Sequence, residues 1–527
     1  MKRKHYPYLF IFPLLMVFIA IPMNRARGPY WLGSNLDPEY VYLLNADNLA
    51  GLRGVGHIDH PGTPVQVMGA LTIRALHCFS RGTDDVHTDV VKRPEYYLNA
   101  MNTILVSLNV IMLSILGIVS LILTGSLGVS LWLQASMFLS IVILQFGLTR
   151  VTPEPLLFLA SMMMIGAVLY AVSCLKQEKP TGRLLVLFAL ITGFGMACKV
   201  TFLPLMVIPL IVLPGIKNKI SYLAASTVGF VVFTLPIIRM YNRFFGWIHQ
   251  LVTHSGHYGN GPSGLISTGR LMENLKSLIL HHAFFSISLS IGFLVLVAGF
   301  GVPRFRNLRK VPESNLYFKF LVAVVMAQVI GLLIVSKHAS DHYLLPVLSL
   351  SGLALFFVYS FVYSFVYSYL KNLGISFRVL SWVILAALVI GINPWNQIQS
   401  RIDAFTRLKE TSLAIHQHAV ETYRDFARVY YYTGSSPEYA LKFGDDLSRS
   451  YHSEALNRIY KDVYFYDIWT QRLTRFDYNR VESLERMRST YGDKILFQGT
   501  PGLKIPGLEL KKIFDNQSKE RISIIHP

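Results

Sequence analysis

Long apolar runs separated by polar segments are the most regular feature of the chain. A run of about 20 apolar residues is long enough to cross the hydrocarbon core of a bilayer as a helix. The pattern therefore predicts a polytopic α-helical membrane protein with about 11 transmembrane helices, of which the fifth and sixth are short enough to form one interrupted helical pair. The predicted spans are Tyr6–Pro22, Asn99–Leu123, Leu127–Leu148, Pro153–Leu175, Leu184–Ala197, Thr201–Pro214, Ile220–Ile238, Leu280–Gly301, Leu316–Val335, Tyr343–Val366 and Val379–Ile392.

The connection between the first two spans, Asn24–Leu98, is far longer than two packed helices need. Such long loops usually carry function. Within it, Asp37–Glu39 has the residue order of a helix start, with Asp as the cap and Pro at the first position, and Gly51 is a stop signal. Thr63–Ser80 is predicted as a second helix, whose broad apolar side suits a membrane interface.

The composition changes after Asn393 and is no longer membrane-like. A helix is predicted first, over Ile398–Val429, and short strands then alternate with helical stretches, which is typical of a small α/β domain. We therefore divide the chain into a membrane domain, 1–393, and a small C-terminal α/β domain, 394–527, whose sequence contains no metal motif, phosphate loop or nucleophile elbow. The predicted strands are Val429–Thr433, Val463–Tyr466 and Ile495–Gly499.

Composition excludes an ordinary soluble protein, because 52% of the residues are apolar and only 15% are charged. The formal net charge of +19 would by itself suggest nucleic acid as a partner. However, the segment after Asn393 has 20 Lys and Arg against 17 Asp and Glu, and much of the remaining excess lies in short loops between spans. The charge therefore carries topological information, and no nucleic-acid partner is expected.

Basic residues between the spans predict the orientation of the chain. When the spans alternate from a cytoplasmic N-terminus, each longer inside segment is basic, as the positive-inside rule requires. The loop 24–98 and the domain 394–527 then lie outside the cytoplasm. The basic inside segments are Lys2–Lys4, Lys176–Arg183, Lys217–Lys219, Arg304–Lys310 and Lys371–Arg378.

Ionisable residues gather at the predicted outer ends of the spans and in the outer loops. Any one of them could simply be solvated or reach the interface with a long side chain, but their collection on one side favours a functional site. They are Asp37, Glu39, His57, Asp59, His60, Arg150, Glu154, Lys199, Arg239, His254, His257, Lys337, His338, Asp341 and His342.

Three of these residues have both a structural and a functional interpretation. Asp37 is a good helix cap, and a cap can still face a cavity. Glu154 follows Pro153 at a helix start, where the helix dipole favours a carboxylate. Lys199 stands between two apolar spans with almost no loop, so its ammonium either reaches the interface or meets an anion such as a phosphate.

A metal site is a further interpretation of the first loop. His57, Asp59 and His60 have suitable side chains, although two histidines three residues apart in a loop are more often found without a metal. The Gly-rich stretch His254–Pro262 could approach a ligand, but it lacks the strand–helix context of a nucleotide loop. The sequence therefore establishes no cofactor, and a divalent cation is the one candidate.

Residues 1–393 resemble the GT-C superfamily of membrane glycosyltransferases, and most closely the branch of protein O-mannosyltransferases and bacterial lipid A aminoarabinose transferases. Asp37–Glu39 falls where that family has its catalytic acid, although a proline here separates two acids that are adjacent in the family; Asp37 is the favoured match. Glu154 falls where a second outer-loop acid is expected. Cys198–Thr201 resembles the family's Thr-Lys turn, and Asp341–Pro346 resembles the aromatic-rich start of a late span.

The resemblance implies inverting transfer of a sugar from a polyprenyl-phosphate-linked donor to a lipid, glycan or protein acceptor outside the cytoplasm. It also implies an enzyme surrounded by membrane lipids, in the inner membrane of a bacterium. Asp37 would be the base, supported by Glu39 and Glu154. The substrate-binding residues would be Asp59, His60, Arg150, Lys199, His254, His257, Lys337, His342 and Tyr343.

Two functions of other classes stay open. A transporter or flippase of lipid-linked sugars would have inverted repeats and broken helices with charges at the bilayer midplane. The sequence shows no clear internal repeat, and its charges fall at span ends. A non-catalytic membrane protein of envelope assembly is the other alternative.

Overall fold

The computed structural model divides into two compact units. The first unit comprises residues 1–20, 59–64 and 105–398, and the second comprises 21–58, 65–104 and 399–527. The structure describes residues 3–33, 39–79, 84–255, 259, 261, 263–264, 268–372, 387–478, 480–502, 505–515 and 520–525.

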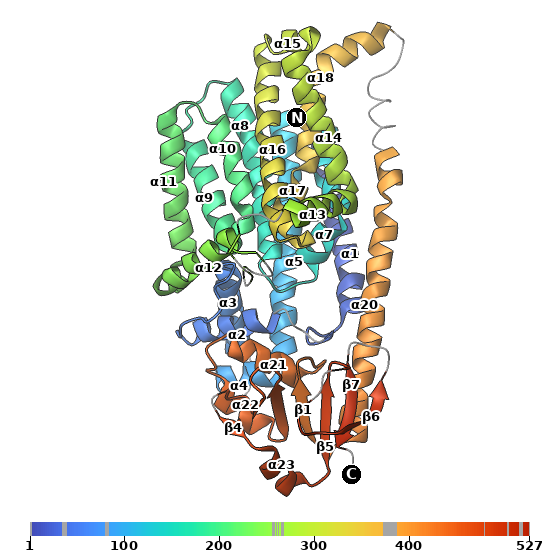
Figure 1. Ribbon diagram of the computed structural model, residues 1–527. Coiled ribbons are helices and arrows are strands. Elements are labelled where there is room, and N and C mark those ends of the chain that lie inside the picture. The colour runs from blue at the N-terminus through green and yellow to red at the C-terminus, as the bar shows by residue number, and fades with distance from the viewer. Residues whose placement is uncertain are drawn as a thin grey trace. The chain divides into compact units, whose positions relative to one another are not determined.

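The first unit is a bundle of apolar helices (Figure 1). Within it, α16 packs against α10, α13, α14 and α18, while α9 packs between α8 and α11. Its elements, some shared with the second unit, are η1 Arg3–Phe10, α1 Ile11–Arg27, α5 Pro94–Thr124, α6 Leu127–Ala135, η2 Ser136–Leu139, α7 Ile141–Leu148, α8 Glu154–Lys176, α9 Gly182–Cys198, η3 Val200–Met206, α10 Val207–Val212, α11 Ile216–Phe233, η4 Leu235–Met240, α12 Tyr241–Thr253, α13 Thr268–His281, α14 Ala283–Gly301, α15 Pro303–Leu308, α16 Pro312–Lys337, η6 Asp341–Leu344, α17 Leu345–Ser349, α18 Ser351–Asn372 and α20 Pro394–Gln417.

The protein is an integral membrane protein by the length and apolar composition of its helices. Among the described residues, six helices are long and apolar enough to cross a membrane, or up to eight if each of two bent pairs is one span. The first ten predicted runs fall on these helices and on the shorter α9 and η3–α10. The eleventh, Val379–Ile392, lies largely outside the described residues, so a total of eleven stays a prediction.

Two predicted spans are broken helices. The run Leu127–Leu148 bends by 82° at Ser140, and the run beginning at Ile216 bends by 89° before continuing into α12. Apolar side chains of α12, including Phe245 and Val252, remain exposed. A helix with such a face after a sharp bend is suited to lie along a membrane interface.

Close contact between α9 and α11 depends on glycine. A Cβ atom on Gly193 would lie 2.6 Å from the backbone carbonyl carbon of Gly229. Small residues at such a crossing let two helix backbones approach in a membrane. This crossing fixes α9, whose last residue, Cys198, directly precedes Lys199.

The second unit contains a seven-stranded sheet in the order β4-β3-β2-β1-β5-β7-β6, which confirms the predicted small sheet domain. β1 pairs in parallel with β2 and β5, and the outer pairs are antiparallel. The remaining elements are α2 Glu39–Ala50, α3 Thr63–Phe79, α4 Val86–Lys92, η7 His418–Thr422, β1 Ala427–Tyr431, α21 Pro437–Asp446, α22 Ser453–Ile459, β2 Val463–Asp467, β3 Arg472–Thr474, β4 Val481–Glu482, α23 Leu484–Tyr491, β5 Ile495–Gly499, β6 Leu510–Asp515 and β7 Arg521–Ile525.

Alternation along the central strands produces two apolar faces. Val429 and Phe497 belong to one buried cluster, while Leu496 joins Ile522 and Ile415 in another, on the side where α20 packs.

The predicted helix Ile398–Val429 is too long: α20 ends at Gln417, and a π-helical stretch follows. β1 begins at Ala427 because its backbone pairs with β2 and β5.

The first loop supplies three helices to this second unit. The predicted helix start at Asp37–Glu39 is followed by α2 from Glu39, and the predicted second helix is α3. α2 is buried on nearly all sides, and the Asn45 side chain donates to the carbonyls of Val41 and Leu447 and accepts from the Gly56 amide. Polar contacts therefore hold these loop segments to the C-terminal segment.

Candidate active site

A buried ion pair lies at the centre of the candidate site in the first unit. The Lys199 ammonium donates to Oε1 of Glu154, and the two residues are 2% and 3% exposed. Glu154 is the first residue of α8, and Lys199 joins α9 to η3 in an extended conformation. The predicted outer-end residues Glu154 and Lys199 are therefore brought together at one end of their helices.

The local sequence explains why these charges are tolerated away from water. Pro153 and Pro155 suit the first turn of a helix, and Glu154 there lies beside the positive end of the α8 dipole. Lys199 then supplies a full opposite charge. A buried pair of this kind needs such compensation, because removing two ions from water costs several kcal/mol each.

Aromatic and imidazole rings surround the pair. Nε2 of His342 lies 3.9 Å from the same Glu154 oxygen, and the Lys199 ammonium lies 4.5 Å from the centre of the Tyr343 ring. The ring of His342 stacks on Phe146, with centroids 4.9 Å apart. Nδ1 of His342 is 2.8 Å from the Ser340 hydroxyl, which fixes the ring orientation.

The segment 59–64 of the long first loop lies beside this cluster. The His60 ring lies edge-on to Trp247 and Tyr343, at centroid distances of 5.2 and 6.0 Å. The amide of Gly62 donates to the carbonyl of Cys198, one residue before Lys199. The predicted binding residues His60, Lys199, His342 and Tyr343 are therefore neighbours.

Other predicted residues lie further from the pair or in other parts of the structure. The Arg150 guanidinium lies 5.8 Å from the centre of the Phe146 ring, and Asp59 is half-buried beside His60. Lys337 donates to the carbonyl of Val252, and Nδ1 of His254 lies 2.9 Å from the Thr253 hydroxyl. These two residues are not seen in contact with the Glu154–Lys199 pair. The other predicted site residues are His57 and Glu39, both buried in the second unit, and Asp37 and His257, which lie outside the described residues.

Two aromatic residues of the site were not predicted. Phe146 stacks on His342, and Trp247 contacts His60. Each belongs to a broken span, α7 or α12. In the sequence each therefore lies within an apolar run, which does not indicate a site residue. The predicted site residues that lie close to these two rings in the structure are Arg150 and His60. Neither residue by itself indicates an aromatic partner.

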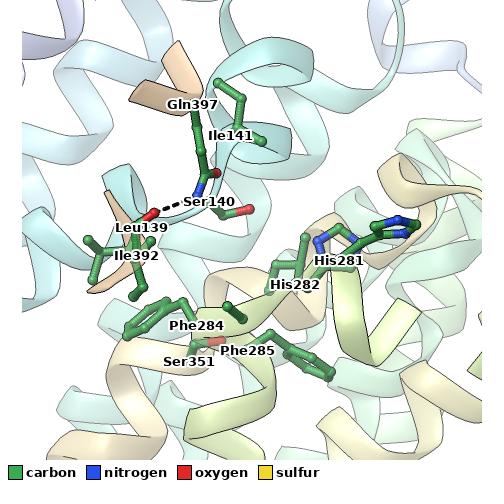
Figure 2. Close-up of a pocket in the computed structure, with 12 residues that line it drawn as sticks. Leu139, Ser140, Ile141, His281, His282, Phe284, Phe285, Ser351, Ile392 and Gln397 are labelled. Carbon is green, nitrogen blue, oxygen red and sulfur yellow. Dashed lines mark hydrogen bonds between the residues drawn. The ribbon is translucent and has the colours of Figure 1, made fainter. Parts of the chain in front are cut away.

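A separate pocket lies elsewhere in the first unit (Figure 2). Its lining includes Phe284, Phe285 and Ile392, with His281 and His282 on one side. Nε2 of His282 lies 3.3 Å from Asp341, a residue of the predicted outer end. None of the predicted catalytic or binding residues lines this pocket within the described part of the chain, so we place the candidate site at the ion pair.

Comparisons with known proteins give one structural match. No protein-family model matches the chain, and no curated protein matches it in sequence. The crystal structure of ArnT from Cupriavidus metallidurans bound to undecaprenyl phosphate is similar at a TM-score of 0.48 and 10% sequence identity, over 98% of each chain.

Proposed function

We propose that the protein is an inverting glycosyltransferase that moves a sugar from a polyprenyl-phosphate-linked donor to an acceptor outside the cytoplasm. The observation that supports this function is the buried Glu154–Lys199 pair with His342 and Tyr343, set at the ends of membrane-spanning helices. A lipid carrier can lie between such helices while its phosphate stays at the level of their ends. The ammonium of Lys199 provides a counter-charge at that level.

The proposed chemistry divides the roles between two parts of the chain. Asp37 removes the proton of the acceptor hydroxyl as that oxygen attacks the anomeric carbon of the donor sugar. The bond from that carbon to the phosphate oxygen breaks, and Lys199 with Arg150 stabilises the negative charge of the departing polyprenyl phosphate. Glu154 orients Lys199 and, with Glu39, supports the acid–base step.

A direct test uses purified protein in lipid nanodiscs with polyprenyl phosphates that carry single labelled sugars, and envelope membranes as the source of acceptor. The proposal expects labelled acceptor and an equal amount of free polyprenyl phosphate. An intact donor under all of these conditions would contradict a transferase, provided that donor binding is detected in the same sample.

A transporter of lipid-linked sugars is the second candidate, because two spans are broken helices of the type that transporters use. The two functions separate in sealed vesicles. A transporter moves the label to the other leaflet with the lipid–sugar bond intact, whereas a transferase breaks that bond.

The proposed orientation gives a further prediction. A reporter that is active only outside the cytoplasm, fused after Pro527, is expected to be active, because the basic segments Lys176–Arg183 and Arg304–Lys310 favour the cytoplasm. A reporter fused within Lys176–Arg183 is the matched control and is expected to be silent. The reverse result at both positions would show that the orientation, and with it the outer-face site, is wrong.

A further inference from the structure

Three ligand-type side chains meet in the second unit, outside the candidate active site. They are Asp47 at the end of α2, His87 at the start of α4 and His452 directly before α22. One potential ligand atom from each lies within 4.8 Å of the others, and this is the one such group of three or more in the described part of the chain. Asp47 and His452 are fully buried, and the His87 side chain is 20% exposed.

The ring nitrogens converge on one carboxylate. Nδ1 of His87 lies 2.7 Å from Oδ2 of Asp47, and Nε2 of His452 lies 2.8 Å from the same oxygen. The other oxygen of Asp47, Oδ1, is buried and has no hydrogen-bond partner among the described residues. A buried carboxylate oxygen without a hydrogen-bond partner lowers the stability of the folded protein, so its presence here favours a bound ligand.

A fourth residue completes the pattern of a metal site. Nδ1 of His452, on the far side of its ring, lies 3.1 Å from Oδ1 of Asp445, which also accepts the backbone amide of His452. The hydroxyl of Ser453 donates to Oδ2 of Asp445. Metal-ligating histidines commonly make this contact, because a carboxylate behind the ring fixes its tautomer and makes the facing nitrogen a better ligand.

We propose that Asp47, His87 and His452 bind one divalent transition-metal ion, with Zn²⁺ as the best fit, and that Asp445 orients His452. Imidazole and carboxylate ligands at a small, nearly closed site suit Zn²⁺ in tetrahedral coordination, with water as the fourth ligand. Tetrahedral ligands at about 2.0 Å from zinc are about 3.3 Å apart, so the nitrogens need to withdraw from Asp47 by only about half an ångström.

Charge and chain connectivity both favour this assignment. With neutral histidines, the two charges of Zn²⁺ are balanced by the carboxylates of Asp47 and Asp445, so the buried cluster becomes neutral. The ion would join three segments that are far apart in the sequence, since Asp47 and His452 are separated by 405 residues. Its role is therefore to stabilise the second unit, where it holds two loop helices to the C-terminal segment.

The alternative is a network held by protons alone. Burial lowers the pKa of His452, but its hydrogen bonds with Asp445 and Asp47 outweigh this and raise that pKa to about 9. Burial likewise raises the pKa of Asp47, yet hydrogen bonds from His452 and His87 hold it below its usual value. A charged His452 would donate to one oxygen of each carboxylate without a metal, although Oδ1 of Asp47 would still lack a partner. Measurement of bound metal distinguishes the two states.

The test uses the full-length protein, purified without a polyhistidine tag in a buffer free of chelator. Elemental analysis is expected to find about one zinc per chain, and X-ray absorption is expected to show only N and O ligands at about 2.0–2.1 Å. Zn²⁺ at 100-fold above its dissociation constant is expected to raise the Tm of the chelator-treated protein by about 5–10 °C. Absence of stoichiometric zinc, or zinc without an effect on Tm, would overturn the proposal.

Three variants complete the test. His87→Gln removes the most exposed ligand and is expected to lose both the zinc and its effect on Tm, while His77→Gln, a half-buried histidine of the same unit outside the cluster, keeps them. Gly51→Ala leaves every ligand in place, but its Cβ would lie 2.6 Å from Cε1 of His87, so it is expected to weaken zinc binding by displacing the ring. Full zinc retention in His87→Gln would contradict the assignment even if the other variants behave as expected.

Discussion

Asp37→Asn is expected to leave the protein folded and able to bind its donor while lowering the rate of sugar transfer by about 10²–10⁴-fold. Asn caps a helix about as well as Asp, so the cost to folding is small. It has no carboxylate to accept the proton of the acceptor hydroxyl, so assistance by a general base is lost. Expression, thermal unfolding, donor binding and single-turnover transfer, measured on one preparation, check each part of this result.

Glu39→Gln is the matched control, because Glu39 is the second acid of the same segment and the first residue of α2. A moderate fall in transfer is expected there, since Glu39 has only a supporting role in the proposed chemistry. If Asp37→Asn transfers sugar at a near-normal rate while Glu39→Gln has almost no transfer, the role of base belongs to Glu39. If neither change slows turnover, this loop does not carry the catalytic base and the proposed mechanism is wrong.

Much of the fold was predictable because it follows from local patterns. The apolar run of α8 is continuous and long, so its length alone predicts a span, and β5 was predicted over Ile495–Gly499, the same bounds that the structure gives. Bends were not predictable in this way. The run Leu127–Leu148 is apolar on both sides of Ser140, where the helix direction changes by 82°. The bend was not predicted because hydropathy does not depend on the direction of the helix.

The site was only partly predictable, because position along a span does not identify a spatial neighbour. The sequence predicted Glu154 and Lys199 on the same face, and it left Lys199 either reaching the interface or meeting an anion such as a phosphate. The structure pairs Lys199, the residue that follows α9, with Glu154, the first residue of α8. The cluster of Asp47, His87 and His452 had no sequence signal, because no motif spacing relates residues that lie 40 and 405 positions from Asp47.

The pairing of Lys199 with Glu154 changes the result expected from substituting either residue. Lys199→Met leaves the Glu154 carboxylate buried without its partner, which is expected to destabilise the protein by about 3–5 kcal/mol. Glu154→Gln leaves the ammonium in the same position and is expected to cost a similar amount. A loss of transfer in either single variant therefore reports on folding as well as on chemistry.

The double variant Lys199→Met, Glu154→Gln separates the two effects. Replacing a whole buried ion pair with neutral side chains of similar size is often neutral or stabilising, so thermal stability is expected to return close to that of the unchanged protein. Transfer is not expected to return, because the cation that stabilises the departing phosphate is absent; a charge-assisted contact worth about 1.5–3 kcal/mol corresponds to a loss of about ten- to a hundred-fold. Stability is measured by thermal unfolding and transfer by release of polyprenyl phosphate. Recovery of both in the double variant would make the pair a purely structural link between α8 and α9, and the phosphate-binding role would then belong to another cation.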